Sequence, residues 1–122
     1  MKVAPPEIEA QLGCSNIPVL LDTGSERSLI SCKHLEQITS LGVKPRLSRV
    51  QLNCVTASGQ SLEIIGEIKL CLKIQGFSWR WKFLVSRKLQ GSSILGRDFI
   101  AKTKMVIDIG NSCLYFAFAP ET

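Results

Sequence analysis

The sequence predicts an all-β fold, a small closed or curved antiparallel β-barrel with one or two short helices. Three observations predict it: short runs of alternating polar and apolar residues recur along the chain, clusters of turn-forming residues separate these runs, and only two segments have helical signals. The chain has 122 residues, which suits one compact core. We therefore expect a single domain over residues 1–122, with its core at about residues 7–118.

A hairpin is the first predicted element, and it ends at an aspartate. Residues 7–12 alternate polar and apolar side chains, and turn-forming residues at 13–16 separate them from an apolar run at 17–21. This pattern predicts two antiparallel strands, the second of which runs into Asp22.

The first helix is expected over residues 32–40. Ser31 can cap its N-terminus, and Gly42 can end it. The only histidine of the chain, His34, falls on this helix, and we expect it on the helix surface. A cysteine nucleophile paired with His34 is disfavoured, because no Asn or Asp adjoins this histidine to orient it.

Residues 47–55 and 62–74 have the pattern of two further strands. The small and polar residues at 56–61 suit an exposed and mobile hairpin tip between them. Another strand follows over 77–83, where four aromatic residues alternate with polar ones. We interpret its aromatic face as core rather than as a platform for a ligand.

The last predicted elements are a helix and a hairpin. The helix covers residues 97–104, after a glycine turn at 96. Residues 105–109 and 113–118 then flank a turn at 110–112, which predicts two antiparallel strands. Strands thus dominate the chain from end to end.

Composition excludes several classes of protein. The chain is 45% hydrophobic and 20% charged, as in a globular domain. No apolar run approaches the roughly 20 residues that cross a bilayer, and the N-terminus lacks a secretory signal, so we expect no membrane partner. Five scattered cysteines without a C-x-x-C pair argue against a disulfide framework or a zinc site. We expect buried free thiols in a reducing compartment, and no metal or cofactor.

The net charge of +5 is concentrated late in the chain, where seven cations share residues 80–104 with Asp98 alone. Such a segment could attract acidic partners or nucleic acid. A solvated face is favoured, because the aromatic residues that RNA-binding segments interleave with Arg and Gly are missing. Nucleic acid is therefore not expected as a partner.

One loop has the residues that peptide hydrolysis by carboxylates requires. This chemistry uses two carboxylates that share one proton, one as the base toward water and the other as the acid toward the scissile carbonyl. A loop that presents such an aspartate needs a hydroxyl residue to fix its turn and a glycine where backbone approaches backbone. The sequence Leu-Leu-Asp-Thr-Gly-Ser at 20–25 meets these requirements, so Asp22 is the candidate catalytic residue.

With these residues the sequence resembles the retropepsins, the homodimeric aspartic proteases of retroviruses and LTR retrotransposons, and the gypsy type above all. The resemblance rests on the loop at 20–25, a flap-like hairpin with its tip near 56–61, and the Ile-Leu-Gly-Arg-Asp-Phe element at 94–99. It implies the retropepsin-like acid protease fold and an aspartic endopeptidase that acts on peptide or polyprotein substrates. It also implies an intracellular location, in the cytoplasm or in virus-like particles.

The resemblance assigns roles within the loop. Asp22 is implied as the catalytic carboxylate, Thr23 as a brace between two loops across a twofold axis, and Gly24 as backbone that faces the substrate. Ser25 stands where the family often has Ala. We hypothesise that its hydroxyl donates to the Asp22 carboxylate and moves activity toward lower pH.

The resemblance also assigns supporting and substrate-binding residues. Glu26 and Arg97 are expected to form an ion pair beneath the loop that holds its geometry. The flap that closes over a bound peptide is expected to contain four residues, although its tip is less rich in glycine than in the best-known retroviral members: Thr56, Ala57, Ser58 and Gly59.

The chain carries one catalytic loop and needs two. It holds three aspartates, and neither Asp98 nor Asp108 repeats the Asp-Thr-Gly context. An isologous dimer supplies the second loop, so we expect a homodimer. Residues 8–12 and 114–118 are candidates for a shared terminal sheet. Core packing is an equal alternative for three apolar residues near the end: Leu114, Phe116 and Phe118.

Two other functions stay open from the sequence. A noncatalytic dimerisation or interaction domain with the same fold is the main alternative, and the intact Asp-Thr-Gly-Ser and Ile-Leu-Gly-Arg elements argue against it. A nucleic-acid-binding module that uses the late basic segment is the other, and it predicts salt-dependent binding that does not depend on Asp22.

Overall fold

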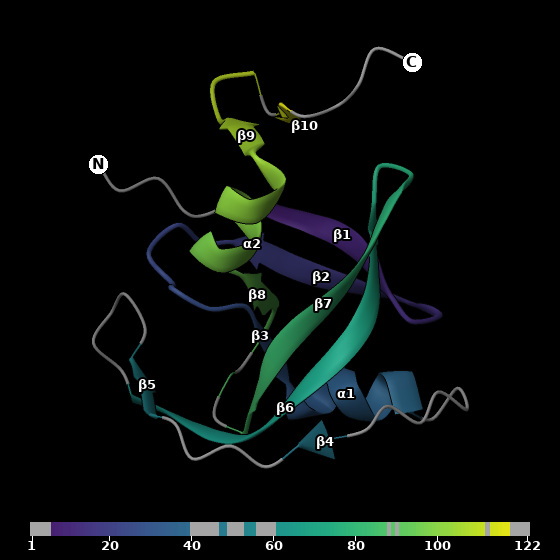
Figure 1. Cartoon of the computed structure of the whole chain (residues 1–122), viewed down its shortest axis with the longest axis vertical. Coiled ribbons are helices and arrows are strands. Elements are labelled where there is room, and N and C mark those ends of the chain that lie inside the picture. Colours follow the sequence, from purple (N-terminus) through teal and green to yellow (C-terminus); the bar gives the residue numbers. More distant parts are fainter. Residues whose placement is uncertain are drawn as a thin grey trace.

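The computed structural model describes residues 6–39, 47–48, 53–55, 61–87, 89, 91–111 and 113–117. They form a curved sheet, two short helices and a C-terminal hairpin (Figure 1). No helix within these residues is long and apolar enough to span a bilayer. The elements are β1 (Glu7–Leu12), β2 (Ser15–Leu21), β3 (Leu29–Ser31), α1 (Cys32–Thr39), β4 (Leu47–Ser48), β5 (Asn53–Val55), β6 (Ser61–Ile74), β7 (Phe77–Ser86), β8 (Ser93–Leu95), α2 (Arg97–Thr103), β9 (Met105–Asp108) and β10 (Cys113–Phe116).

A closed barrel forms the body of the domain. Strands β1, β2, β8, β3, β7 and β6 follow one another around it, and β1 also pairs with β6. The predicted all-β barrel with two short helices is confirmed. Most strand pairs are antiparallel as predicted, but β2–β8 and β3–β7 are parallel. Because β2 and β8 run the same way, the loops that follow them emerge side by side.

Alternating burial and tight turns account for the two long hairpins. Gly13 has a φ of 62° in the turn between β1 and β2. Between β6 and β7, Gln75 and Gly76 both have positive φ, 53° and 83°, the combination that lets a two-residue turn follow the twist of its strands. The side chains of β1 and β2 that enter the barrel are Ala10, Leu12, Ile17, Val19 and Leu21.

The row of aromatic residues on β7 packs into the core, as predicted. The ring of Phe99 in α2 lies 5.1 Å from the rings of both Trp79 and Trp81, measured between centroids. Phe116 in β10 lies 5.0 Å from Trp79 and 5.5 Å from Phe77. Strand β7 therefore holds both α2 and the C-terminal hairpin, and Phe116, only 2% exposed, is core.

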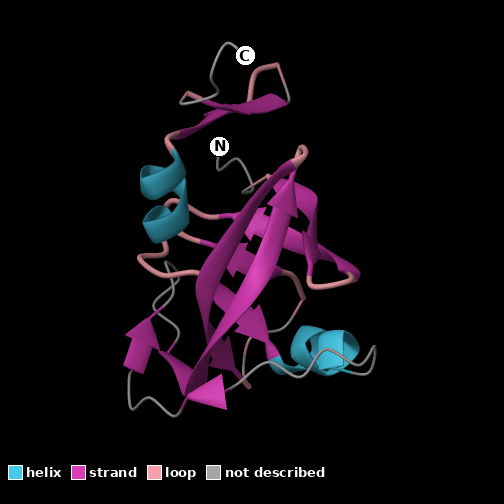
Figure 2. Cartoon of the chain, turned by 45° about the vertical axis from the view of Figure 1, so that its right-hand side comes forward, coloured by secondary structure: helices cyan, strands magenta, loops and turns pink. Residues whose placement is uncertain are grey.

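The C-terminal hairpin is a separate two-stranded sheet of β9 and β10. It lies beyond α2, at the end of the molecule where the tip of the β6–β7 hairpin also lies (Figures 1 and 2), and Gln75 Nε2 in that tip donates to Leu114 O at 3.1 Å. Asp108 accepts hydrogen bonds from the Asn111 backbone N–H at 3.1 Å and from its Nδ2 at 2.8 Å, and these bonds lower the pKa of Asp108. Ile109 and Tyr115 are 55% and 53% exposed.

Of the strand predicted over residues 47–55, the structure describes two short pieces, β4 and β5, and residues 49–52 lie outside the described residues. Both pair with β6, at Glu67–Ile68 and at residues 61–63 respectively. Of the predicted flap tip at residues 56–61, residues 56–60 lie outside the described residues, and Ser61 is the first residue of β6.

Helix α1 has the predicted N-cap but not the predicted exposure of His34. Ser31 Oγ accepts a hydrogen bond from the His34 backbone N–H at 3.1 Å. The His34 side chain is 7% exposed, because His34 and Ile38 form the face of α1 that packs on the sheet. Its Nδ1 lies 2.7 Å from Ser93 Oγ. Burial, with a contribution from the charge of Lys33, lowers the pKa of His34.

The cysteines also differ from the prediction. Cys14, Cys71 and Cys113 are exposed rather than buried, and Cys32 is partly buried. Cys14 lies in a turn, and Cys71 is on the outward face of β6. Their apolar character had suggested the core, but strand alternation exposes Cys71 and Cys113, and a turn exposes Cys14. The side chain of Cys54 lies outside the described part of the structure.

Candidate active site

The Asp22 loop leaves the barrel at the end of β2. The Asp22 backbone N–H donates to Leu95 O at 3.0 Å, which continues the pairing of β2 with β8. The loop then turns back on its own aspartate: Gly24 N–H donates to Asp22 Oδ1 at 2.9 Å, and Ser25 N–H donates to Asp22 O at 3.2 Å. A buried strand and a closed turn thus fix the direction of the Asp22 carboxylate.

The Asp22 carboxylate is partly exposed and forms no ion pair with another described residue. Thr23 and Gly24 are exposed beside it at the tip of the loop. The predicted contact of Thr23 across a twofold axis stays a prediction. A single chain therefore offers one carboxylate at its surface, held in position by the loop.

Gly96 lets the loop after β8 approach the Asp22 loop. A Cβ atom at this position would lie 2.6 Å from the carbonyl oxygens of both Ser25 and Arg27, which no side chain permits. The close approach lets Arg97 N–H donate to Ser25 O at 2.7 Å. The glycine of the Ile-Leu-Gly-Arg element therefore serves the contact between the two loops.

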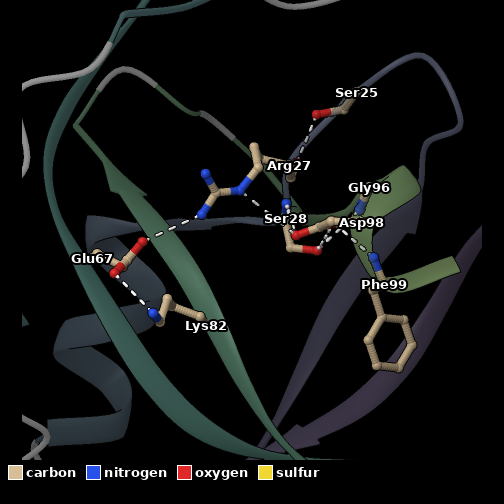
Figure 3. Close-up of polar contacts among 8 residues, drawn as sticks. All are labelled: Ser25, Arg27, Ser28, Glu67, Lys82, Gly96, Asp98 and Phe99. Carbon is tan, nitrogen blue, oxygen red and sulfur yellow. Dashed lines mark hydrogen bonds and ion pairs between the residues drawn. The ribbon is translucent and has the colours of Figure 1, made fainter. Parts of the chain in front are cut away.

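The carboxylate of Asp98 connects these loops through a partly buried network (Figure 3). Its Oδ2 accepts from the Ser28 backbone N–H at 3.1 Å, and its Oδ1 accepts from Ser28 Oγ at 2.8 Å and from Phe99 N–H at 2.8 Å. Ser28 Oγ in turn accepts from Gly96 N–H at 3.1 Å. Because Ser28 is fully buried, these donors have no solvent to replace the carboxylate.

Arg27 extends the network to the barrel wall (Figure 3). Its Nη2 lies 3.3 Å from Glu67 Oε2, and its Nε lies 3.9 Å from Asp98 Oδ2. Lys82 Nζ lies 3.5 Å from Glu67 Oε1. A chain of charges thus runs from α2 past the end of the Asp22 loop to β6 and β7.

The predicted Glu26–Arg97 ion pair is present but is not the main brace. Arg97 Nη2 lies 3.7 Å from Glu26 Oε1, with the two side chains 57% and 84% exposed. An exposed pair of this kind contributes about 0–1 kcal/mol. The backbones contribute more directly, since Asp98 N–H donates to Glu26 O at 3.2 Å. The role we expected of Glu26 and Arg97 belongs to Asp98 and Ser28.

Ser25 also differs from its predicted role. Its hydroxyl donates to Arg27 O at 2.8 Å rather than to the Asp22 carboxylate, and its side chain is buried. The predicted hydrogen bond from Ser25 to that carboxylate is therefore wrong for the single chain, and the expected shift of activity toward lower pH stays a prediction. The predicted flap residues lie outside the described part of the structure: Thr56, Ala57, Ser58 and Gly59.

A cysteine–histidine site finds no support. The His34 ring is hydrogen-bonded to Ser93, and the pKa of the neighbouring Cys32 thiol is raised by burial, with the charge of Arg87 opposing the rise. A nucleophilic cysteine needs a lowered thiol pKa. Within the described residues, no cluster of His, Cys, Asp and Glu side chains is suited to hold a metal ion.

Sequence reasoning missed Arg27, Ser28 and Glu67, and it treated Asp98 only as a failed second catalytic residue. Asp98 did carry a signal, because an acidic residue in the first turn of a helix commonly caps backbone N–H groups. Its partner Ser28 carried none, since the two residues are 70 positions apart.

Comparisons with known proteins agree with this geometry. Residues 3–108 match the family model of the retroviral aspartyl protease. The chain is similar to the crystal structure of the retroviral protease-like domain of Ddi1 from Leishmania major, with a TM-score of 0.72, 20% identity, and coverage of 95% of this chain and 90% of that one. It is also similar to EIAV protease in complex with the inhibitor HBY-793, with a TM-score of 0.67, 21% identity, and coverage of 80% and 86%. No relative was found among curated protein sequences.

Proposed function

The chain belongs to the retroviral aspartyl protease family, and on that premise we propose that it is an aspartic endopeptidase in which Asp22 is the catalytic residue. The observation that carries this proposal is the state of the Asp22 carboxylate. It is held by Gly24 N–H at 2.9 Å, lies at the end of a buried strand, and is left without an ion-pair partner among the described residues.

The proposed chemistry follows from two such carboxylates brought together. Like charges a few ångströms apart cannot both ionise, so the pair keeps one proton between them. The ionised carboxylate takes a proton from a water molecule, which attacks the scissile carbonyl, while the protonated one donates a hydrogen bond to the carbonyl oxygen. The pair titrates with apparent pKa values that belong to neither copy alone.

The second carboxylate comes, in this proposal, from a second copy of the chain. The sequence has one Asp-Thr-Gly loop, and an isologous dimer places two identical loops around its axis. The C-terminal hairpin supports the proposal, because its Ile109 and Tyr115 are exposed and Ile109 lines a cavity of about 320 Å³. This cavity is lined by residues 6–8, Leu21, residues 107–109, Cys113 and Leu114.

The proposed substrate is a peptide segment in extended conformation, including segments of a polyprotein. Main-chain hydrogen bonds would hold it, with alternate side chains in apolar pockets. Residues 56–59 would close over it as the flap and exclude water. In the alternative, a noncatalytic domain of the same fold, the closed turn around Asp22 would have no catalytic carboxylate to position.

Cleavage of a hydrophobic peptide library at acidic to neutral pH tests the proposal. We expect cleavage by the wild type and a loss of at least about 100-fold in Asp22→Asn, because general acid–base catalysis contributes roughly 10²–10⁴-fold. Glu36→Gln is the matched control, since it changes an exposed carboxylate on α1 to an amide and should keep full activity. Equal cleavage by all three proteins would assign the activity to a contaminant, and no cleavage by the wild type would favour the noncatalytic domain.

A further inference from the structure

The hairpin β6–β7 has two faces of opposite character. Its inner face carries the aromatic and aliphatic core. Its outer face carries four exposed cations, which we call the basic strip: Lys69, Lys73, Arg80 and Lys82. The strip could not be predicted from the sequence, because two of its members lie outside the late basic segment. Only the strand register brings all four together.

Register places the charges of the strip against one another. Lys69 lies directly opposite Lys82, and Arg80 lies opposite Cys71, between the two lysines of β6. Like charges directly opposite each other destabilise a sheet. The arrangement therefore opposes folding and needs another explanation.

Little negative charge neutralises the strip. Glu67 reaches Lys82 at 3.5 Å but is shared with Arg27 at 3.3 Å. Of the carboxylates that the structure describes, none lies within ion-pair distance of Lys69, Lys73 or Arg80. Three cations thus remain available to an external polyanion, and the net charge of +5 adds long-range attraction.

The other residues of this face indicate which polyanion fits. Between the cations lie the small side chains of Cys71 and Ser78, and no aromatic ring. A protein partner would need an apolar core of contact there, and binding of single strands through their bases would need rings for base stacking. Contacts to phosphates need neither. Same-face residues on a strand are about 6.6 Å apart, so the strip offers a short row of separate cations.

We propose that the basic strip is a docking surface for the phosphodiester backbone of nucleic acid, independent of base sequence. One end of the strip, where Lys73 pairs with Ser78 near the tip of the β6–β7 hairpin, lies on the opposite side of the molecule from the loop between β2 and β3 (Figure 1). The other end adjoins that loop, because Lys82 contacts Glu67, which contacts Arg27. Binding therefore places a nucleic acid close to the candidate active site and uses none of the residues at Asp22.

Fluorescence anisotropy with labelled RNA single strands and DNA duplexes of mixed sequence tests the proposal over a range of salt concentrations. Three phosphate contacts predict that the logarithm of the binding constant falls with the logarithm of salt with a slope of about −2 to −3. The test variant is Lys69→Glu with Arg80→Glu, and it leaves Lys82 in place because Lys82 also contacts Glu67. We expect it to lose at least about 10-fold in affinity and about two units of slope, with its circular dichroism and thermal unfolding unchanged.

The matched control is Lys33→Glu with Lys102→Glu, two exposed lysines on α1 and α2 with the same change in net charge. It should retain the wild-type slope. An equal loss of affinity in both variants would show that net charge, and not the basic strip, determines binding. Competition by polyglutamate at concentrations equal to nucleic acid would assign the surface to an acidic protein, and a wild type that does not bind at low salt would remove the proposal altogether.

Discussion

The loop that carries Asp22 and the C-terminal hairpin satisfy their contacts in different ways. The loop and the segment after β8 pair nearly all of their hydrogen-bonding groups within one chain, through Asp98, Ser28 and Gly96. The hairpin is anchored at Phe116, while Ile109 and Tyr115 remain exposed. One region is complete in a single copy, and the other presents apolar surface.

In the proposed dimeric protease, this difference separates two functions. A catalytic carboxylate has to be held in position before its partner arrives, so its support comes from its own chain. An interface has to keep apolar surface until the partner covers it. The comparison therefore predicts that changes near the loop act on folding and geometry, while changes at the tip of the hairpin act on association.

The largest effect is expected from Asp98→Ala. It leaves the N–H and the hydroxyl of fully buried Ser28 without their acceptor, a loss of about 4 kcal/mol in the free energy of unfolding, since each unsatisfied buried donor costs about 1–3 kcal/mol. Phe99 N–H keeps Gly96 O as an acceptor. Urea unfolding followed by circular dichroism measures the loss. Arg97→Ala is the matched control and should cost about 0–1 kcal/mol. A larger cost for Arg97→Ala than for Asp98→Ala would show that the exposed ion pair, not the Asp98 carboxylate, braces the loop.

Phe116→Ala should detach the hairpin without unfolding the barrel. Removing a buried phenylalanine costs about 3 kcal/mol or more, and here the loss falls on the contact with Phe77 and Trp79. Hydrogen exchange should rise in β9 and β10 and stay low in β1, β2 and β6. Equal loss of protection in barrel and hairpin would mean that the two regions unfold as one unit and that the comparison between them fails.

Ile109→Asp and Tyr115→Lys should weaken association and leave the monomer intact. Exposed substitutions usually change folding stability by less than about 0.5 kcal/mol, whereas a charge placed in an interface should raise the dimer Kd about 10-fold or more. Analytical ultracentrifugation measures the Kd. Asn16→Lys, an exposed change on β2, should leave it unaltered. A wild-type Kd in both hairpin variants would move the interface elsewhere.

The smallest effect concerns His34. Its pKa is lowered in the folded chain, so the unfolded chain binds more protons as pH falls below the ordinary histidine pKa of about 6.5. Stability should therefore decrease as pH falls from about 6.5 toward the lowered folded pKa, with no further loss below it. His34→Gln should flatten this part of the profile. An unchanged profile in the variant would show that other groups cause the decrease.

Local patterns predicted much of the fold and the core of the site. The strand that runs into Asp22, the Ser31 cap, the aromatic row on β7 and the last hairpin all depend on residues close together in sequence. The parallel pairs β2–β8 and β3–β7 were not predicted, because each joins strands far apart in the chain and hairpin patterns reveal only antiparallel neighbours.

The remaining errors have the same origin. Ser28 and Asp98 are 70 positions apart in the sequence, and His34 and Ser93 are 59 positions apart. The sequence around one partner therefore does not indicate the other. We expected the Ser25 hydroxyl to donate to the carboxylate of Asp22, which is close in sequence, whereas the turn directs it to Arg27 O. The burial of a polar side chain can be predicted from a sequence only when its hydrogen-bond partner is close in that sequence.

Mixing wild-type chains with Asp22→Asn chains tests the central proposal most directly. The two are unfolded together, refolded at varied ratios and assayed at constant total protein. If each site takes one Asp22 from each copy, mixed dimers are inactive, and activity should follow the square of the wild-type fraction. Activity that falls in direct proportion to the wild-type fraction would show that one chain carries a complete site, and would contradict the account.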